Sequence, residues 1–455
     1  MTKSSLQLRM VMAAVGCVVC CGAAWYAACA GVSRLFAETA TRLRATEYES
    51  EATRLAERAL RLSPSDPEAH YARAVAAAAG GVEEASAVEE LERATALQPR
   101  YYLTWLRLGR ARERVGDVDG AVAAYGEASR LAPFYAAPRW QAGNTLLRAG
   151  RREEAFEALR RAAASRPSLF LYTVELAWRA YDGDARAVAE AVSPQSASAR
   201  VALARFFVKR GRTGDALAQF RAAGDGVSHD ERQALVADLI AAGQYREARE
   251  VWSDKDGKKH SGDGERQGDS QERQDGVGEG QERTGAGVAD VLIDGGFEDK
   301  ARDEGAGFGW RFVRGVAGVV VSLDVSEPRG GAHSLCFEFG GTPDASARLA
   351  SQLVAVEPRG RYRLRFAART EKLLSGAMPL VTVLDAGAGG GVVASSTALE
   401  GGTNGWRDYE VEFVAPEATG AVVFVVGRQS CAQTPCPIYG RVWFDDFVLE
   451  KLSSG

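Results

Sequence analysis

A run without any charged residue opens the chain, from Met10 to Ser33. Such a run is long enough to cross a hydrocarbon layer of about 30 Å as an α-helix. It therefore predicts a transmembrane helix over residues 10–33. Because Lys3 and Arg9 precede the run, the excess of positive charge places residues 1–9 in the cytoplasm and the rest of the chain outside. We expect a single-pass protein of a bacterial inner membrane, with its body on the extracytoplasmic side.

The same run also fits two cleaved forms of the chain. Ala28-Cys29-Ala30 has the small residues at alternate positions that a signal peptidase site requires, which would release a secreted protein. Tyr26 to Cys29 resembles the cleavage box of a bacterial lipoprotein. An anchor, a signal sequence and a lipoprotein all carry the body of the chain across a membrane, and the pattern leaves the three open.

Prolines recur in the first half of the chain at intervals of 35, 34 and 34 residues, each after an alanine-rich amphipathic segment, at Pro64, Pro99, Pro133 and Pro167. A period of this length is typical of an array of helical hairpins. Proline ends a helix because it has no N–H for the next backbone hydrogen bond. The pattern predicts about six hairpins within residues 34–252, and the hairpin near Tyr172 to Val192 keeps the pattern least well.

The clearest hairpin carries the residues that recur in each unit, in the order Trp105, Leu108, Gly109, Gly116, Ala121, Tyr125 and Ala128. The small residues let paired helices approach closely, and the aromatic residues fill the gap to the next hairpin. These residue types at these offsets resemble the tetratricopeptide repeat. The resemblance implies an all-α solenoid that binds a protein or peptide along its concave face. The first helices offer four polar residues for such contacts, with a solvated helix face as the alternative: Arg107, Arg110, Arg139 and Asn144.

Residues 253–287 consist almost entirely of Gly, Asp, Glu, Gln, Arg and Lys. Such a segment cannot bury enough apolar surface to offset the conformational entropy lost on ordering, so we predict a disordered charged linker. A flexible chain of this length spans on the order of 30–35 Å. We therefore expect the domains on either side to move independently.

Short runs rich in Val, Phe, Tyr and Leu alternate with Gly-rich turns over residues 288–455. This spacing predicts an all-β antiparallel sandwich, so the whole chain is expected to be multidomain. The domain resembles the galactose-binding-like jelly rolls of bacterial carbohydrate-binding modules. The resemblance lies in the order of its short sequence motifs: Asp294 to Glu298, Gly309-Trp310, Gly331 to Leu335, Tyr362 to Leu364, Trp406 to Tyr409 and Trp443 to Phe447.

The resemblance implies a structural calcium ion near the two ends of this domain. Glu298 of the opening element would hold the ion together with Asp445 or Asp446 of the last strand. Oxygen ligands from distant strands suit a hard cation. Surface or capping carboxylates without a metal are the alternative.

The resemblance also implies that the domain binds polysaccharide. Sugar rings stack on aromatic faces beside polar groups that fix their orientation. Trp310, Trp406 and Tyr409 are the candidates for this contact, and packing in the core is their alternative role.

The cysteines of the C-terminal domain have two expected states. Cys431 and Cys436 lie close together before the last strand, and in an exported domain we expect them to form a disulfide. Cys336 falls inside a predicted strand and is expected to be a buried free thiol.

Composition and motifs narrow the function further. The 455 residues carry a net charge of −4, which does not fit the basic footprint of a nucleic-acid-binding protein. The sequence has no Walker-type loop, HExxH or GxSxG motif, so we do not expect an enzyme. We expect an exported, membrane-anchored adaptor in envelope or exopolysaccharide assembly or export. A purely structural protein scaffold without sugar binding and a glycan-processing enzyme are the alternatives.

Overall fold

The computed structural model describes residues 3–43, 49–77, 84–253, 292–298, 307–344, 346–387, 389–431 and 435–453. The chain divides into two compact units, Met1–Pro194 and Gln195–Gly455. The first unit is helical, and the second holds the last helices together with the strands. The division falls inside the helical array and not at the predicted linker. Apart from Ser253, that linker lies outside the described residues.

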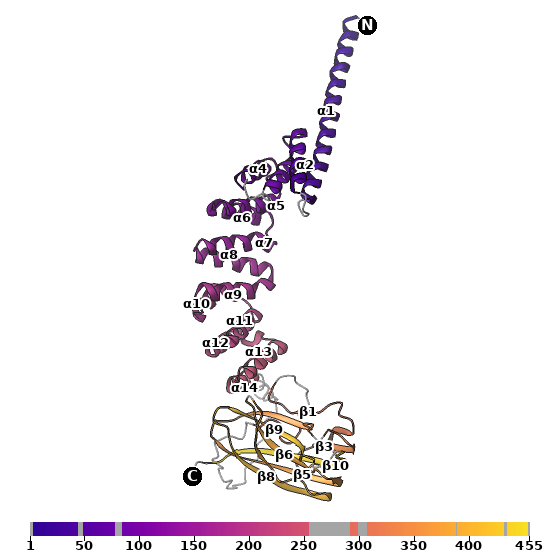
Figure 1. The fold of residues 1–455 in the computed structure, drawn as a ribbon, viewed down its shortest axis with the longest axis vertical. Helices are drawn as coiled ribbons and strands as arrows, with labels where there is room; N and C mark the ends of the chain where they lie inside the picture. Colours follow the sequence, from indigo (N-terminus) through magenta and orange to yellow (C-terminus); the bar gives the residue numbers. More distant parts are fainter. Residues whose placement is uncertain are drawn as a thin grey trace, which may run out of the picture. The chain divides into compact units, whose positions relative to one another are not determined.

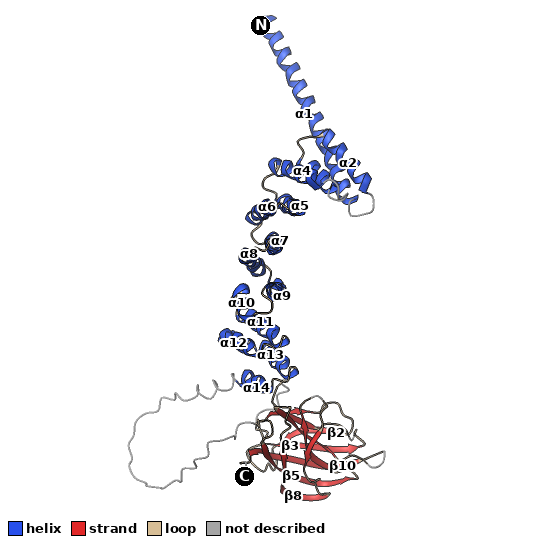
Figure 2. Cartoon of the chain, turned by 60° about the vertical axis from the view of Figure 1, so that its left-hand side comes forward, coloured by secondary structure: helices blue, strands red, loops and turns tan. Residues whose placement is uncertain are grey.

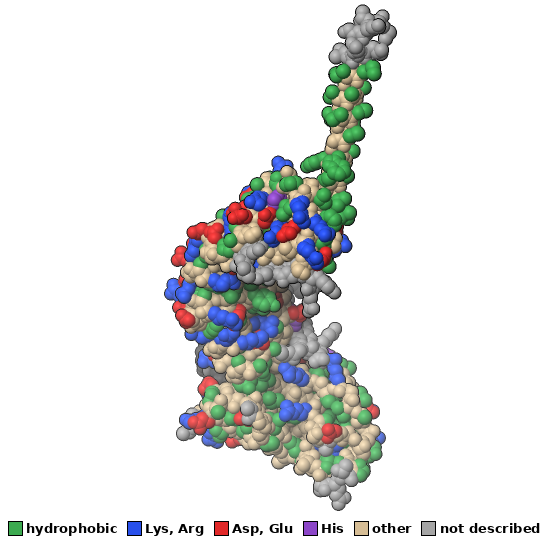
Figure 3. Space-filling view, turned by 45° about the horizontal axis from the view of Figure 1, so that its top comes forward, with side chains coloured by type: hydrophobic (Ala, Val, Ile, Leu, Met, Phe, Trp, Pro, Cys, Tyr) green, Lys and Arg blue, Asp and Glu red, His purple; other side chains and the backbone are tan. Residues whose placement is uncertain are grey.

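The apolar N-terminal run is part of one long helix, α1 (Lys3–Leu43). The large apolar side chains from Met10 to Val32 are exposed, and hydrophobic side chains cover much of the face of α1 seen in Figure 3. By length and composition, Met10–Leu43 is a candidate membrane span near the N-terminus. The helix is compatible with the predicted anchor or signal sequence.

The second half of α1 belongs to the helical array, so the boundary predicted after Ser33 lies inside a continuous helix. Ser33, Ala37 and Ala40 are buried where α1 lies against α2 (Glu49–Leu62) and α3 (Pro67–Ala77). The Ser33 hydroxyl donates to a carboxylate oxygen of Asp66 at 3.0 Å. A membrane span in α1 would therefore continue without a break into the folded body of the first unit.

After the first pair of contacting helices, α1 with α2, six further hairpins of two consecutive helices follow in the described part of the chain. The six pairs are α3 with α4 (Glu84–Leu97), α5 (Tyr102–Arg114) with α6 (Val118–Leu131), α7 (Ala136–Arg148) with α8 (Arg152–Ser165), α9 (Phe170–Ala180) with α10 (Ala185–Val192), α11 (Ala197–Lys209) with α12 (Thr213–Ala223), and α13 (His229–Ala241) with α14 (Tyr245–Ser253). Figure 1 shows α5 to α10 of the first unit stacked in chain order. The predicted solenoid is confirmed, with seven pairs of helices among the described residues where about six were expected, and it includes the short hairpin α9–α10, whose second helix has 8 residues.

The hairpin α5–α6 shows why the repeat folds in this way. Gly116, at φ +83°, turns the chain between the helices, a conformation that glycine adopts without a steric penalty. Asp117 caps the first turn of α6 with its carboxylate. Gly109 lies against the ring of Tyr125, which is fully buried and donates its hydroxyl to Glu113 at 2.9 Å. The small residue on one helix thus makes room for the aromatic residue on the other.

Two five-stranded antiparallel sheets form the sandwich of the second unit (Figure 2). One sheet has the order β1-β4-β9-β6-β7 and the other β2-β3-β10-β5-β8. The strands are β1 (Arg311–Phe312), β2 (Val319–Asp324), β3 (Ser334–Gly341), β4 (Ala350–Ala355), β5 (Arg361–Ser375), β6 (Pro379–Asp385), β7 (Val392–Ser395), β8 (Gly402–Val414), β9 (Ala421–Arg428) and β10 (Ile438–Lys451). The predicted antiparallel sandwich is confirmed. The jelly-roll class and the likeness to carbohydrate-binding modules stay predictions.

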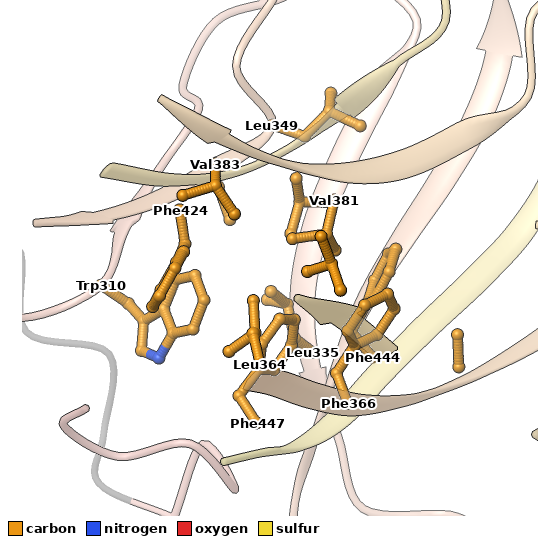
Figure 4. Packing of buried hydrophobic residues seen from close by; sticks show 14 of the residues in the cluster. Trp310, Leu335, Leu349, Leu364, Phe366, Val381, Val383, Phe424, Phe444 and Phe447 are labelled. Carbon is orange, nitrogen blue, oxygen red and sulfur yellow. The ribbon is translucent and has the colours of Figure 1, made fainter. Parts of the chain in front are cut away.

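One apolar core fills the space between the two sheets. Both sheets contribute to it, for example through Phe366 of β5 and Phe424 of β9, which are buried. Figure 4 shows Phe366, Phe444 and Phe447 pointing toward the same interior, and the rings of Phe366 and Phe447 lie 5.2 Å apart between their centroids. Aromatic pairs at this spacing stabilise a core beyond the area that they bury.

Candidate functional site

A hollow of about 340 Å³ lies on the solenoid of the first unit, between first helices of successive hairpins. Its walls combine apolar, charged and uncharged polar side chains: Ala74, Val75, Leu91, Arg107, Arg110, Glu113, Arg114 and Gln141. Leu91 and Ala74 are buried beneath it, while Arg107 is exposed and Arg110 is half-buried. Sites with apolar walls and a few converging polar groups are those that proteins use to hold ligands.

The charges of the hollow are unevenly matched. Arg107 and Arg110 have no hydrogen-bonded or ion-paired partner among the described side chains. The nearby Arg112 binds Glu92 at 2.8 Å, and Arg148 forms an ion pair with Glu113. Two guanidinium groups at this hollow are therefore without a protein partner in the described part of the chain.

Glu113 does not neutralise these two groups, because its carboxylate is already bound. Burial alone would raise the pKa of Glu113, but the hydrogen bond from Tyr125 and the bond from Arg148 bring it below its ordinary value. In return, burial and the hydrogen bond to Glu113 raise the pKa of Tyr125. Glu113 stays ionised, and its charge is taken up by Tyr125 and Arg148.

The structure divides the four solenoid residues suggested by the sequence into two pairs. Arg107 and Arg110 line the hollow, whereas Arg139 donates to the carbonyl oxygen of Pro133 at 2.6 Å and Asn144 donates to its own helix. Sequence reasoning missed Gln141, which also lines the hollow. The repeat could have identified Gln141, because it stands 34 residues after Arg107, at the equivalent position of the next repeat.

Glu298 and Asp445 of the sandwich hold one loop, residues 329–333. Glu298 accepts the backbone N–H groups of Ala332 at 2.8 Å and His333 at 3.2 Å. Asp445, which is fully buried, accepts those of Arg329 at 2.9 Å and Gly330 at 3.2 Å through one oxygen. Its other oxygen accepts the N–H of Asp446 at 2.8 Å. Residues from both ends of the domain therefore fix this loop.

The charges of this cluster differ in their surroundings. Burial raises the pKa of Asp445, although its three backbone donors act in the opposite direction. For Glu298, burial likewise acts to raise the pKa, but the donors Ala332 and His333 prevail and lower it. Asp446 faces the guanidinium of Arg329 at 3.4 Å. These carboxylates are surrounded by hydrogen-bond donors.

Such a donor set does not fit a calcium ion in this conformation. Calcium needs six to eight oxygen ligands, whereas N–H groups occupy the oxygens of Glu298 and Asp445, and a guanidinium already faces Asp446. The described residues hold no group of three metal-ligating side chains. Calcium at these residues stays a prediction from the resemblance.

A calcium titration of the full chain, read by its melting temperature, tests this point. A calcium ion that binds the folded chain, at a free concentration 100 times its dissociation constant, would add about 2.7 kcal/mol to the free energy of unfolding. The melting temperature would rise by several degrees, on the order of 2–4 °C per kcal/mol. The hydrogen bonds around Asp445 predict no such rise. A clear rise with calcium that EDTA reverses would contradict them.

The three aromatic candidates for sugar binding lie in different surroundings. Trp310 is buried in the core beside Phe447 (Figure 4), and its indole N–H donates to Asp294 at 3.1 Å. Tyr409 is half-buried, with its ring stacked on Phe366 at 5.5 Å. Trp406 is half-buried and lies near the guanidinium of Arg369. They are not brought together on one exposed face, so saccharide binding stays a prediction.

Cys431 and Cys436 form a disulfide, as predicted. The buried Arg428 donates to the carbonyl oxygen of Cys436 at 3.1 Å and so holds the loop that the bridge closes. Cys336 is a buried free thiol, also as predicted, and burial raises its pKa to about 11. A thiol with so high a pKa reacts poorly, because the thiolate is the reactive form.

Comparison with known proteins gives matches among solved structures alone. No protein-family model matches the chain, and no curated protein matches it. A crystal structure of MamA is 18% identical and covers 40% of this chain and 91% of its own, with a TM-score of 0.29. TTC0263, a thermophilic TPR protein of Thermus thermophilus, is 25% identical and covers 46% of this chain and 99% of its own, with a TM-score of 0.26.

PilF of Pseudomonas aeruginosa is 17% identical and covers 50% of this chain and 93% of its own, with a TM-score of 0.32. TM-scores this low carry no argument about function. The assignment of the helical array to the tetratricopeptide type therefore rests on the period of its sequence and on the hairpins described above.

Proposed function

We propose that this chain is a non-catalytic interaction scaffold, whose solenoid holds an acidic segment of a protein partner over Arg107 and Arg110. The observation that supports the proposal is the pair of guanidinium groups with no partner among the described residues, set at the mouth of a hollow with an apolar floor. A candidate membrane span continues directly into the same unit. The scaffold would thus present this hollow next to a membrane.

The chemistry of the hollow favours a segment that alternates carboxylates with apolar side chains. A guanidinium group binds a carboxylate through two parallel N–H bonds, which fixes position as well as charge. Apolar side chains of the same segment would bury against Leu91 and Ala74, which lie beneath the hollow. Solenoids offer such extended surfaces because each repeat adds to the same face.

The test compares a fluorescent peptide of alternating glutamate and leucine with its glutamine counterpart, by anisotropy on the full chain in detergent. Arg107→Glu with Arg110→Glu should weaken binding of the acidic peptide more than about a hundredfold, because each of the two lost bonds to a charged group is worth about 1.5–3 kcal/mol. The matched control is Arg58→Glu with Arg61→Glu, two exposed arginines at the same spacing on α2. The control should bind as the wild type does.

Equal binding of the acidic and the glutamine peptide would contradict the proposal, as would an unchanged affinity in the Arg107 and Arg110 variant.

Polysaccharide binding, with a role in envelope or exopolysaccharide assembly, is a finer prediction that rests on the resemblance of the sandwich to carbohydrate-binding modules. Trp406 and Tyr409, which are half-buried, are the remaining candidates for a sugar contact, since Trp310 is buried in the core.

A further inference from the structure

The last helix of the solenoid and the sandwich are in contact inside the second compact unit. Helix α14 lies against strand β4. At the start of α14, Tyr245 is buried, and its hydroxyl donates to the carbonyl oxygen of Ala386, just after β6, at 2.8 Å. These residues are 141 positions apart in the chain. A buried tyrosine hydroxyl bonded to a specific carbonyl is a defined docking contact.

A second contact lies at the other end of α14. The ring of Trp252 meets that of Phe308 edge to face, with centroids 6.1 Å apart. The guanidinium of Arg249 lies over both rings, 4.9 Å from the centroid of Trp252 and 5.7 Å from that of Phe308. Phe308 is 1% exposed although it precedes the first strand of the sandwich. The aromatic pair and the cation above it bury this part of the sandwich against α14.

Gly307 shows how closely the two parts approach. A Cβ atom at this position would lie 2.7 Å from Nε1 of Trp252, closer than non-bonded atoms tolerate. The close approach of Trp252 is therefore what requires a glycine at position 307.

We propose that the β-sandwich is the C-terminal cap of the solenoid, seated on its last hairpin through Tyr245, Arg249 and Trp252. In a repeat array each hairpin covers the apolar face of its neighbour, so the last hairpin needs a cap of another kind. Here Phe308 and the turn after β6 supply it. Under this proposal the domains on either side of residues 253–287 would not move independently, because the sandwich is docked on α14. The capped end is closed to stacking of a second solenoid, so partners reach the array through its faces.

Hydrogen exchange of the full chain in detergent, read by mass spectrometry, tests the cap. Gly307→Ala, a change within the sandwich segment, should speed exchange of the amides of α14 about tenfold, because the added methyl group separates Trp252 from Phe308. The matched control is Gly309→Ala, where the new methyl group would meet nothing within 4 Å. The control should exchange as the wild type does.

Tyr245→Phe provides the reciprocal test from the solenoid side, since it removes the hydroxyl and keeps the ring. It should speed exchange in the turn after β6, around Ala386, and leave β5 and β10 unchanged. If Gly307→Ala disturbs the whole sandwich, Tyr245→Phe decides the matter. Exchange in α14 unchanged by Gly307→Ala, or exchange around Ala386 unchanged by Tyr245→Phe, would overturn the proposal.

Discussion

Asp445→Asn should lower the free energy of unfolding of the sandwich by about 2–3 kcal/mol, because one of its oxygens becomes an NH₂ group facing backbone N–H donors. Asp445 is fully buried and accepts three backbone N–H groups, from Arg329, Gly330 and Asp446. Whichever way the amide turns, at least one of these donors loses its acceptor inside the protein. An unsatisfied buried donor is more costly than the net gain from an ordinary hydrogen bond.

The neighbouring residue offers a matched control for this change. Asp446 is 44% exposed at its side chain and faces Arg329 at 3.4 Å, so Asp446→Asn should change stability by no more than about 0.5 kcal/mol. Asparagine also tolerates the left-handed backbone of this position, at φ +51°. Hydrogen exchange of the amides of β3 and β10 reports the stability of the sandwich separately from the solenoid. Equal effects of the two substitutions would show that Asp445 does not hold the loop.

Gly109→Ala should destabilise the hairpin α5–α6 by about 1–3 kcal/mol. The new Cβ would lie 2.5 Å from Cε1 and 2.6 Å from Cδ1 of Tyr125. The ring cannot move away freely, because Tyr125 is fully buried and its hydroxyl is bonded to Glu113. This overlap outweighs the gain of about 0.5–1 kcal/mol that alanine brings to a helix interior.

Gly126→Ala gives the opposite sign in the same hairpin. Gly126 lies within α6, and a Cβ there would meet nothing within 4 Å. The substitution should therefore stabilise the hairpin by about 0.5–1 kcal/mol through helix propensity alone. Hydrogen exchange of α5 and α6 measures both variants. Stabilisation by Gly109→Ala would mean that the contact between Gly109 and Tyr125 does not limit helix approach.

The regular parts of this fold were predictable because local rules and tertiary packing agree on them. The spacing of Pro99, Pro133 and Pro167 predicts the hairpins, because a proline cannot continue a helix and each of the three follows the second helix of a hairpin. Apolar runs separated by Gly-rich turns likewise marked the strands of the sandwich. The disulfide between Cys431 and Cys436 was predicted from the short loop between them and from the expected export of the domain, and the structure confirms it.

The features that sequence reasoning missed or left open depend on contacts between distant residues. The pattern of charges ends the apolar run at Ser33, yet α1 continues because Ala37 and Ala40 pack on the next helices. For Trp310 the sequence left a sugar contact and packing in the core open, and the side chain is buried among core aromatic residues. Neither outcome is encoded in the local sequence.

The candidate site was predictable only in part, because the positions of the arginines on a helix follow from the sequence but their neighbours in space do not. Arg107 and Arg110 stand three residues apart on one helix, so the repeat places both on one face. Whether an arginine is free or bound depends on its neighbours in space. Arg139 binds the carbonyl of Pro133, which could not be known from its position in the repeat.

Reversing the sign of the charges on the solenoid and on the peptide ligand tests the proposed scaffold most directly. The wild type should prefer a peptide of alternating glutamate and leucine over its lysine counterpart, and the variant Arg107→Glu with Arg110→Glu should reverse this preference. The reversal identifies these two residues as the contact, because a misfolded variant would lose both peptides and gain neither. A variant that keeps the preference for the acidic peptide, or a wild type that binds both peptides equally, would contradict the account.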